Sequence, residues 1–197
     1  MKERLVLVGN GMAGVRTLEE LLKLAPDRYD ITVFGAEPHP NYNRILLSPV
    51  LAGEKTVDDI VLNDRDWYAG HGIELVTGDP VTAIDRNTRH VHTVSGMSRY
   101  YDRLLLATGS NPFIIPVPGG DKAGVIGFRD IGDVEAMLAA AGEGGRAVVI
   151  GGGLLGLEAA NGLLKNGMDV TVVHLLDSLQ GRPLRAILAH VLRAPRP

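Results

Sequence analysis

Two glycine-rich stretches have the spacing of loops that hold a diphosphate. The first is Gly9-x-Gly11-x-x-Gly14, and residues 151–156 repeat it. In such a loop the first glycine makes a tight turn, the second lets the backbone approach a pyrophosphate, and the third lets a helix pack on a strand. The pyrophosphate then lies against the helix N-terminus, where the helix dipole favours negative charge. Two such loops predict two dinucleotides.

The first loop has the flanks of a nucleotide-binding βαβ unit. Residues 4–8 predict a buried parallel strand, apolar spacing predicts a helix over 12–24, and residues 30–37 predict the next strand. Glu37, at the end of that strand, can accept hydrogen bonds from both hydroxyls of a ribose. A glycine turn of purely structural use leaves Glu37 without a role.

The second loop has a histidine in the corresponding region. Residues 146–150 predict the strand before it, and His174 ends the strand after it. An acid there selects a free ribose 2′-hydroxyl, whereas a histidine could tolerate a 2′-phosphate. An ordinary role at a strand end is equally compatible with His174. The choice between NADH and NADPH therefore stays open.

A flavin paired with a nicotinamide is the chemically useful combination of two dinucleotides. The nicotinamide delivers a hydride, and the flavin converts it into single-electron steps. The chain has no cysteine, which excludes disulfides, iron–sulfur clusters, thiolate zinc sites and a cysteine nucleophile from it. No nucleophile–base arrangement is found. His90 and His92 could hold a metal, but a solvated hairpin is the stronger interpretation.

Composition limits the partners. The 197 residues carry a net charge of −3, which gives no reason to expect nucleic acid or an anionic membrane. The N-terminus is not a signal peptide, and no apolar run reaches the length of a spanning helix. We therefore expect a cytoplasmic location. The electron acceptor and the oligomeric state stay open.

The order of predicted elements gives an α/β, Rossmann-like fold. A βαβ unit is followed by a β-rich insert, another strand, and an incomplete second βαβ unit. Residues 64–70 predict a short helix, and residues 130–141 predict a longer one with Asp130 as its N-cap. We expect an FAD-binding domain over 1–118, the first half of an NAD(P)-binding domain over 119–180, and an atypical basic tail over 181–197.

Several segments resemble a known family. "YDRLLLATGSNPFIIPVPG" (101–119) is similar to a flavin-contact segment of flavoproteins with two dinucleotide-binding domains, the pyridine nucleotide-disulfide oxidoreductase-like group. "LVGNGMAGVRTLEELL", "ITVFGAEPHPNYNRILLSPVLAG" and "GLEAANGLLKNGMDVTVVHL" resemble the N-terminal part of the NAD(P)H-dependent nitrite reductase large subunit. The resemblance covers residues 3–180, and "PHPNYNRILLS" is its most specific piece.

The resemblance implies the residues of both sites. For FAD it implies contacts at Gly9, Gly11, Met12, Ala13, Gly14, Glu37, Arg44, Ser48, Val81, Ala107, Thr108, Gly109 and Arg129. For NAD(P) it implies contacts at Gly151, Gly152, Gly153, Leu154, Leu155, Gly156, Glu158 and His174. Glu158 is expected near the flavin–nicotinamide junction. From the residues alone, Arg44 could equally be a solvated loop arginine.

The implied activity is hydride transfer from NAD(P)H to FAD, as the electron input of a nitrite reductase in nitrate assimilation. The family's sirohaem and iron–sulfur cluster are expected outside this chain. Alternatives are a truncated, non-catalytic dinucleotide-binding module and a fragment of a ferredoxin- or rubredoxin-reductase-like flavoprotein.

The chain also departs from the family. We expect weak flavin retention, because a late segment that holds the ribityl chain is missing. Residues 181–197 contain four arginines, three prolines and no acid, which is typical of a frameshift or early stop, and a genuine basic docking tail is the competing view.

Overall fold

The computed structural model describes residues 2–175 and divides into two compact units. The first contains residues 2–44 and 60–111, and the second contains residues 45–59 and 112–175. The units therefore divide after residue 111, whereas we placed the domain boundary at 118. The second unit also includes the segment 45–59, which the sequence placed in the first domain. The predicted tail over 181–197 lies outside the described residues.

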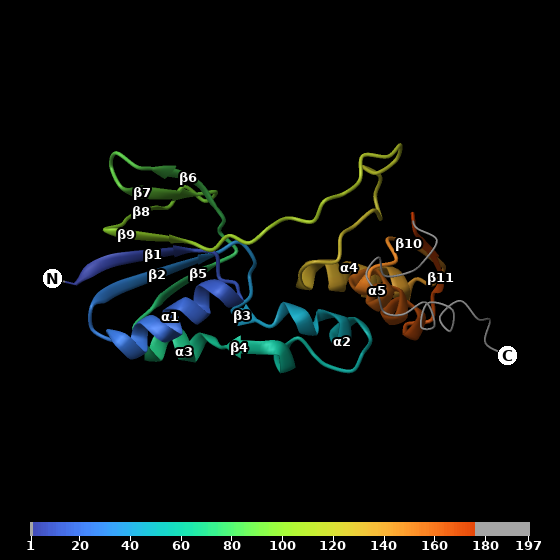
Figure 1. Ribbon diagram of the computed structural model, residues 1–197, viewed down its shortest axis with the longest axis horizontal. Coiled ribbons are helices and arrows are strands. Elements are labelled where there is room, and N and C mark those ends of the chain that lie inside the picture. Colours follow the sequence, from blue (N-terminus) through green and yellow to red (C-terminus); the bar gives the residue numbers. More distant parts are fainter. Residues whose placement is uncertain (1, 176–197) are drawn as a thin grey trace. The chain divides into compact units, whose positions relative to one another are not determined.

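The first unit is built on a parallel sheet of four strands in the order β5-β2-β1-β9. The strands are β1 (Glu3–Val8), β2 (Tyr29–Gly35), β5 (Glu74–Thr77) and β9 (Arg103–Leu106). Helix α1 (Met12–Leu24) connects β1 to β2, and α3 (Arg65–Gly70) precedes β5. Figure 1 shows both helices on one face of this sheet. The helix predicted over 12–24 is confirmed.

Successive side chains of a strand point to opposite faces of the sheet, so β1 contributes to two different hydrophobic clusters. Leu5 and Leu7 of β1 join Val15 and Leu18 of α1 in one hydrophobic cluster. The other face packs against a three-stranded antiparallel sheet, shown on the opposite side from the helices in Figure 1. Its strands are β6 (Val81–Asp85), β7 (His90–Thr93) and β8 (Ser98–Tyr100).

Strand β2 is shorter than predicted. It ends at Gly35, so Glu37 lies two positions beyond the strand. The carbonyl of Phe34 accepts the amide of Gly9 at 2.8 Å, and the carbonyl of Gly35 accepts the amide of Asp79 at 3.3 Å. Both bonds lie at the last two residues of β2, one on the β1 side and one on the β5 side. Glu37 is thus carried on a loop.

That loop leads into β3 (Asn41–Tyr42), which pairs antiparallel with the later strand β4 (Val61–Asn63). Two 3₁₀ turns, Arg44–Leu46 and Asp58–Ile60, span the chain positions at which the units divide. Helix α2 (Leu47–Leu51) lies in the second unit.

The second unit contains another βαβ arrangement. Strands β10 (Arg146–Ile150) and β11 (Asp169–Val173) pair in parallel, and α5 (Leu154–Lys165) connects them. Helix α4 (Ile131–Gly142) precedes them with a capping box, in which Asp130 and Asp133 each accept the other's amide. The predicted N-cap is therefore confirmed. Helix α5 has Asn166 as its C-cap, and Gly167 follows with a φ of +86°.

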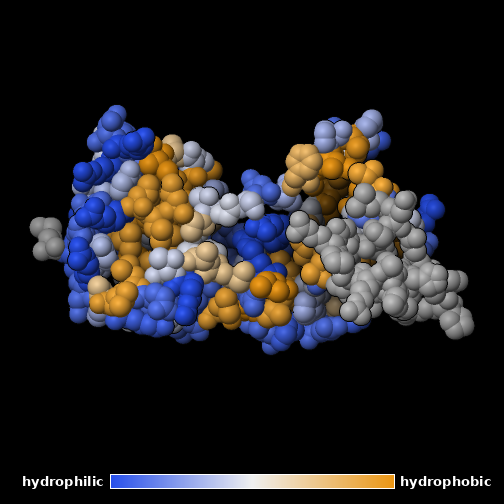
Figure 2. All heavy atoms as spheres, in the orientation of Figure 1, coloured by the Kyte–Doolittle hydropathy of each residue, from blue (hydrophilic) through white to orange (hydrophobic). Residues whose placement is uncertain are grey.

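Apolar side chains are exposed on both strands of this second sheet. Val148 and Ile150 of β10 are more than 60% exposed, and Val173 of β11 is about half exposed. Figure 2 shows hydrophobic surface on this unit as well as on the first. Within residues 2–175, every helix is too short or too polar to cross a membrane.

Candidate functional site

The first glycine loop closes on residues that are distant in the sequence. Gly9 has a φ of +110°, a conformation that side-chain-bearing residues rarely adopt. A Cβ at Gly9 would lie 2.1 Å from the carbonyl oxygen of Ala107. The amide of Ala107 in turn bonds to the carbonyl of Val8 at 2.8 Å. The loop at the end of β1 and the turn after β9 are therefore packed directly together.

The other two glycines of this loop serve different purposes. A Cβ at Gly14 would lie 2.7 Å from the carbonyl oxygen of Gly9, so only glycine lets α1 pack this close. Gly11 is the N-cap of α1, no side chain caps the helix, and no atom lies within 4 Å of its missing Cβ. Met12 and Ala13 begin the helix. The helix amides thus face an open glycine-lined cradle, which fits a diphosphate.

The structure brings the predicted residues Ala107, Thr108 and Gly109 to this cradle. They follow β9 directly, and Gly109 has a φ of +73°. Val81 begins β6 and packs against the cluster that contains Val8 and Phe34. These residues all belong to the first unit.

Glu37 and Arg44, both predicted as FAD contacts, form an ion pair. The Oε2 atom of Glu37 also accepts a hydrogen bond of 2.6 Å from the hydroxyl of Tyr42. The guanidinium of Arg44 lies over the Tyr42 ring, 5.0 Å from its centre. A carboxylate has about four acceptor positions, so Glu37 keeps capacity for ribose hydroxyls. Tyr42 was missed by the sequence analysis, although it stands within the "PHPNYNRILLS" segment.

Asn10, also missed, anchors the first loop to its surroundings. Its Oδ1 accepts a bond of 2.6 Å from the hydroxyl of Tyr68, and its carbonyl accepts a bond of 3.1 Å from Asn41. Its amide nitrogen Nδ2 donates to the carbonyl of His39 at 3.4 Å. Burial raises the pKa of Tyr68 to about 12, which keeps its hydroxyl a donor. Three hydrogen bonds of Asn10 therefore anchor this loop to its surroundings.

The second glycine loop repeats the backbone of the first. Gly151 has a φ of +120°, and its amide bonds to the carbonyl of Val173 at 2.8 Å. A Cβ at Gly156 would lie 2.0 Å from the carbonyl oxygen of Gly151. Gly153 is the N-cap of α5, again with no side-chain cap. The first turn of α5 carries the exposed residues Leu154 and Leu155. This cradle also fits a diphosphate.

His174 follows β11 and contacts this loop. Its Nδ1 atom accepts a hydrogen bond of 3.0 Å from the amide of Gly152. Since Gly151 bonds to Val173 as Gly9 bonds to Phe34, His174 corresponds in register to Gly35 and not to Glu37. The counterpart of Glu37 is residue 176, which lies outside the described part of the chain.

The remaining predicted residues lie in the second unit. The hydroxyl of Ser48 on α2 donates a hydrogen bond of 2.6 Å to Oε2 of Glu158 on α5. The amide of Arg129 donates to the carboxylate of Asp133 at 2.6 Å. Ser48 and Arg129, both expected at the flavin, therefore belong to a different compact unit from the first glycine loop.

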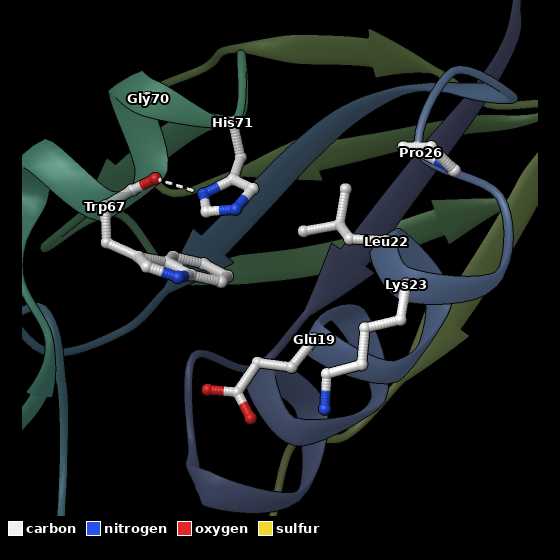
Figure 3. A pocket seen from close by; sticks show the side chains of 7 residues that line it. All are labelled: Glu19, Leu22, Lys23, Pro26, Trp67, Gly70 and His71. Atoms are coloured by element: carbon white, nitrogen blue, oxygen red, sulfur yellow. Dashed lines mark hydrogen bonds between the residues drawn. The ribbon is translucent and has the colours of Figure 1, made fainter.

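A groove of about 690 Å³ lies between α1 and α3 in the first unit (Figure 3). Trp67 and His71 form one wall, where Nδ1 of His71 lies 2.8 Å from the carbonyl of Trp67. Glu19 and Lys23 of α1 line the other side. None of the predicted cofactor contacts lines this groove.

The hairpin histidines do not extend into a larger cluster. The rings of His90 and His92 stack with their centres 6.4 Å apart. Across residues 2–175, no group of three or more histidine, cysteine or acidic side chains is placed to hold a metal ion.

Two βαβ units, each with an open glycine cradle at a helix N-terminus, define a dinucleotide-binding protein of the Rossmann-like class. The chain belongs to the pyridine nucleotide-disulphide oxidoreductase family, which matches residues 3–195.

Relatives with known roles agree with this family. The chain is 56% identical over 98% of its length to a nitrite reductase [NAD(P)H] of Bacillus subtilis, covering 24% of that protein. It is 53% identical, again over 98%, to an assimilatory nitrate reductase electron transfer subunit of the same organism, covering 25% of it. The chain therefore spans about a quarter of these relatives.

Among solved structures, the NADH:rubredoxin oxidoreductase of Clostridium acetobutylicum superposes with a TM-score of 0.83 at 28% identity. The match covers 98% of this chain and 50% of that one. The fold predicted from the sequence is thus confirmed.

Proposed function

We propose that the first unit binds FAD, that the second unit binds NAD(P)H, and that the chain is the electron-input part of a nitrite reductase used in nitrate assimilation. The observation that carries this proposal is the duplicated cradle. Gly9 and Gly151 have the same left-handed turn, and Gly14 and Gly156 leave no room for a side chain. Two ligands of the same diphosphate chemistry account for that repetition.

The residues that would hold FAD follow from the first unit. The amides at the start of α1 face the pyrophosphate, and the 107–109 turn closes the same cradle. Glu37, oriented by Tyr42 and Arg44, would accept the hydroxyls of the adenosine ribose. A bound flavin accepts a hydride from a nicotinamide and releases the electrons singly.

The residues that would hold NAD(P)H lie on the second unit. The α5 amides face the pyrophosphate from the 151–156 loop. Glu158, on the second turn of α5, is held in place by the hydroxyl of Ser48. We assign this carboxylate to the nicotinamide end of the site. The bounds 1–118 for an FAD domain and 119–180 for an NAD(P) domain stay a prediction, since the two compact units divide the chain differently.

The likeness to nitrite reductase supports the onward route of the electrons. Since the chain spans about a quarter of that relative, the site of nitrite reduction is assigned to the remaining part. Sirohaem and an iron–sulfur cluster are placed there as part of the proposal. This chain by itself is expected to reduce no nitrite.

Flavin binding tests the proposal directly. The purified chain is mixed with excess FAD, freed of unbound flavin, and its visible spectrum is recorded before and after NADH is added. We expect a flavin spectrum that bleaches with NADH. Gly11→Ala should lose the flavin, and Gly153→Ala should keep the flavin but lose the bleaching. A wild-type chain that binds neither dinucleotide contradicts the proposal.

A second candidate is a reductase of a small electron-carrier protein. It is favoured by the likeness to NADH:rubredoxin oxidoreductase over nearly the whole chain. The flavin-loaded chain would then reduce rubredoxin or a ferredoxin rapidly in the presence of NADH. If adding the carrier protein does not change the rate of NADH oxidation, this candidate is contradicted.

A further inference from the structure

The two glycine loops place a large and a small residue at the same pair of positions, but in opposite order. In the first unit the pair is Asn10, between the glycines, and Gly35, directly after β2. In the second unit the pair is Gly152, between the glycines, and His174, directly after β11. The matching backbone bonds, from Gly9 to Phe34 and from Gly151 to Val173, establish this equivalence.

In each unit, the loop position and the position after the strand lie so close that only one of them can carry a large side chain. A Cβ at Gly35 would lie 3.0 Å from Cβ of Asn10, so a side chain there would have to push Asn10 aside. In the second unit the glycine stands on the loop, and the His174 ring lies close enough for Nδ1 to accept the Gly152 amide at 3.0 Å. The space that Asn10 fills in one unit is reached by His174 in the other.

The loop residue needs such an anchor. Asn10 is fixed by the three hydrogen bonds of its side chain and carbonyl. Gly152 has no side chain and stands between two more glycines, and glycine loses more backbone freedom on ordering than any other residue. The amide of Gly152 is buried and is satisfied by the imidazole. His174, which lies outside the second glycine loop, therefore anchors that loop as Asn10 anchors the first loop from within it.

We propose that His174 is the positioning residue of the second dinucleotide site, where it holds the glycine loop in the form that receives the pyrophosphate of NAD(P)H. Since Nδ1 accepts a hydrogen bond, the ring is neutral and carries its proton on Nε2. Within residues 2–175, Nε2 is buried and has no hydrogen-bond partner. The inference rests on the proposed function for its ligand, but the loop geometry stands independently.

A preordered loop loses less entropy on binding, so the anchor should appear in the affinity for NADH. His174→Leu keeps a side chain of similar reach but removes the acceptor. We expect it to raise the dissociation constant about threefold to tenfold, the effect of one neutral hydrogen bond. His174→Asn keeps an acceptor oxygen and should stay within about twofold of the wild type.

Three further variants separate the sizes of the two side chains from the hydrogen bond. Gly152→Asn alone should weaken NADH binding because the new side chain meets the imidazole. His174→Gly alone should weaken it because the anchor is lost. The double variant G152N/H174G rebuilds the Asn10–Gly35 pair in size alone, because Tyr68 and His39, which fix the Asn10 side chain, belong to the first unit. It should therefore bind NADH as weakly as His174→Gly. A purely space-filling role of His174 predicts that His174→Leu binds like the wild type, which would overturn the proposal.

Two readouts separate this inference from the proposed function. Calorimetric titration of the 197-residue chain with NADH gives the affinity. Amide hydrogen exchange at Gly152, with ¹⁵N-histidine spectra for the tautomer, reports the anchor without any ligand. If the Gly152 amide is protected in the wild type and exchanges freely in His174→Leu, the anchor is confirmed even when NADH fails to bind. Equal exchange in both proteins refutes it.

Discussion

Ser48 and Glu158 lie 110 positions apart in the sequence and are joined by a hydrogen bond of 2.6 Å. Ser48 follows the loop that carries Arg44 of the first unit, whereas Glu158 lies on the helix after the second glycine loop. Two further contacts fix the same segment, from Asn166 Nδ2 to the carbonyl of Leu51 at 2.7 Å and from Lys165 to Glu54. The chain thus sends residues 45–59 out of the first unit to pack on α5.

Ser48→Ala should weaken that packing. The change removes the donor to Glu158, and we expect the free energy of unfolding of the second unit to fall by about 1 kcal/mol. Thermal unfolding followed by circular dichroism measures it. Lys165→Met is the matched control, because its exposed ion pair with Glu54 should contribute less. Equal losses in the two variants would contradict this reading of Ser48.

Gly162→Ala tests the fit between α2 and α5. A Cβ at Gly162 would lie 2.6 Å from Cγ of Leu51, which is fully buried. We expect the overpacked variant to be less stable by about 1–3 kcal/mol. Gly142→Ala, whose Cβ meets no atom within 4 Å, is the control and should leave stability unchanged or raised.

Leu51→Ala adds a compensation test. Alone it should cost about 2–5 kcal/mol through the cavity that it leaves. Combined with Gly162→Ala it should cost less than the sum of the two single changes, since the new methyl group enters the vacated space. Strict additivity in chemical denaturation would show that α2 does not pack on Gly162 in solution.

Gly14→Ala and Gly11→Ala should separate folding from flavin binding. The first places Cβ 2.7 Å from a backbone oxygen, so it should destabilise the chain by about 1–3 kcal/mol. The second meets no atom and keeps an ordinary φ of −86°, so its melting temperature without ligand should match the wild type.

Gly11→Ala should nevertheless weaken FAD binding by about tenfold or more, because its methyl group holds the diphosphate away from the helix amides. Fluorescence titration with FAD and thermal unfolding give the two quantities. A Gly11→Ala variant that binds FAD normally would argue against a diphosphate in this loop.

Tyr68→Phe should change the alkaline stability of the first unit. Burial raises the pKa of Tyr68 to about 12, above its ordinary value of 10.0. The stabilisation from the neutral hydroxyl is therefore complete below pH 10 and is lost as the pH rises to about 12. The variant should be less stable by about 1 kcal/mol at pH 7, because Asn10 loses a donor.

The same variant should lose stability less steeply than the wild type between pH 10 and 12. Chemical denaturation at several pH values measures the difference between the two proteins. Parallel curves for both would show that Tyr68 ionises as freely in the folded chain as in the unfolded one.

Local features of the chain were readable from its sequence. The helix over 12–24, the Asp130 cap and both glycine loops were predicted and observed. Each depends on spacing within a few residues, on a capping side chain, or on a backbone angle that only glycine adopts without strain. Such preferences belong to the local chain and do not depend on what packs against it.

Only the tertiary structure decided which distant residues meet. Ala107 closes on Gly9, Tyr42 orients Glu37, α2 leaves the first unit for α5, and His174 holds Gly152. From the sequence we took His174 as the counterpart of Glu37, whereas the backbone hydrogen bonds show that it is equivalent to Gly35. Contacts of this kind depend on how strands align and how much space remains between them, and residue spacing along the chain records neither.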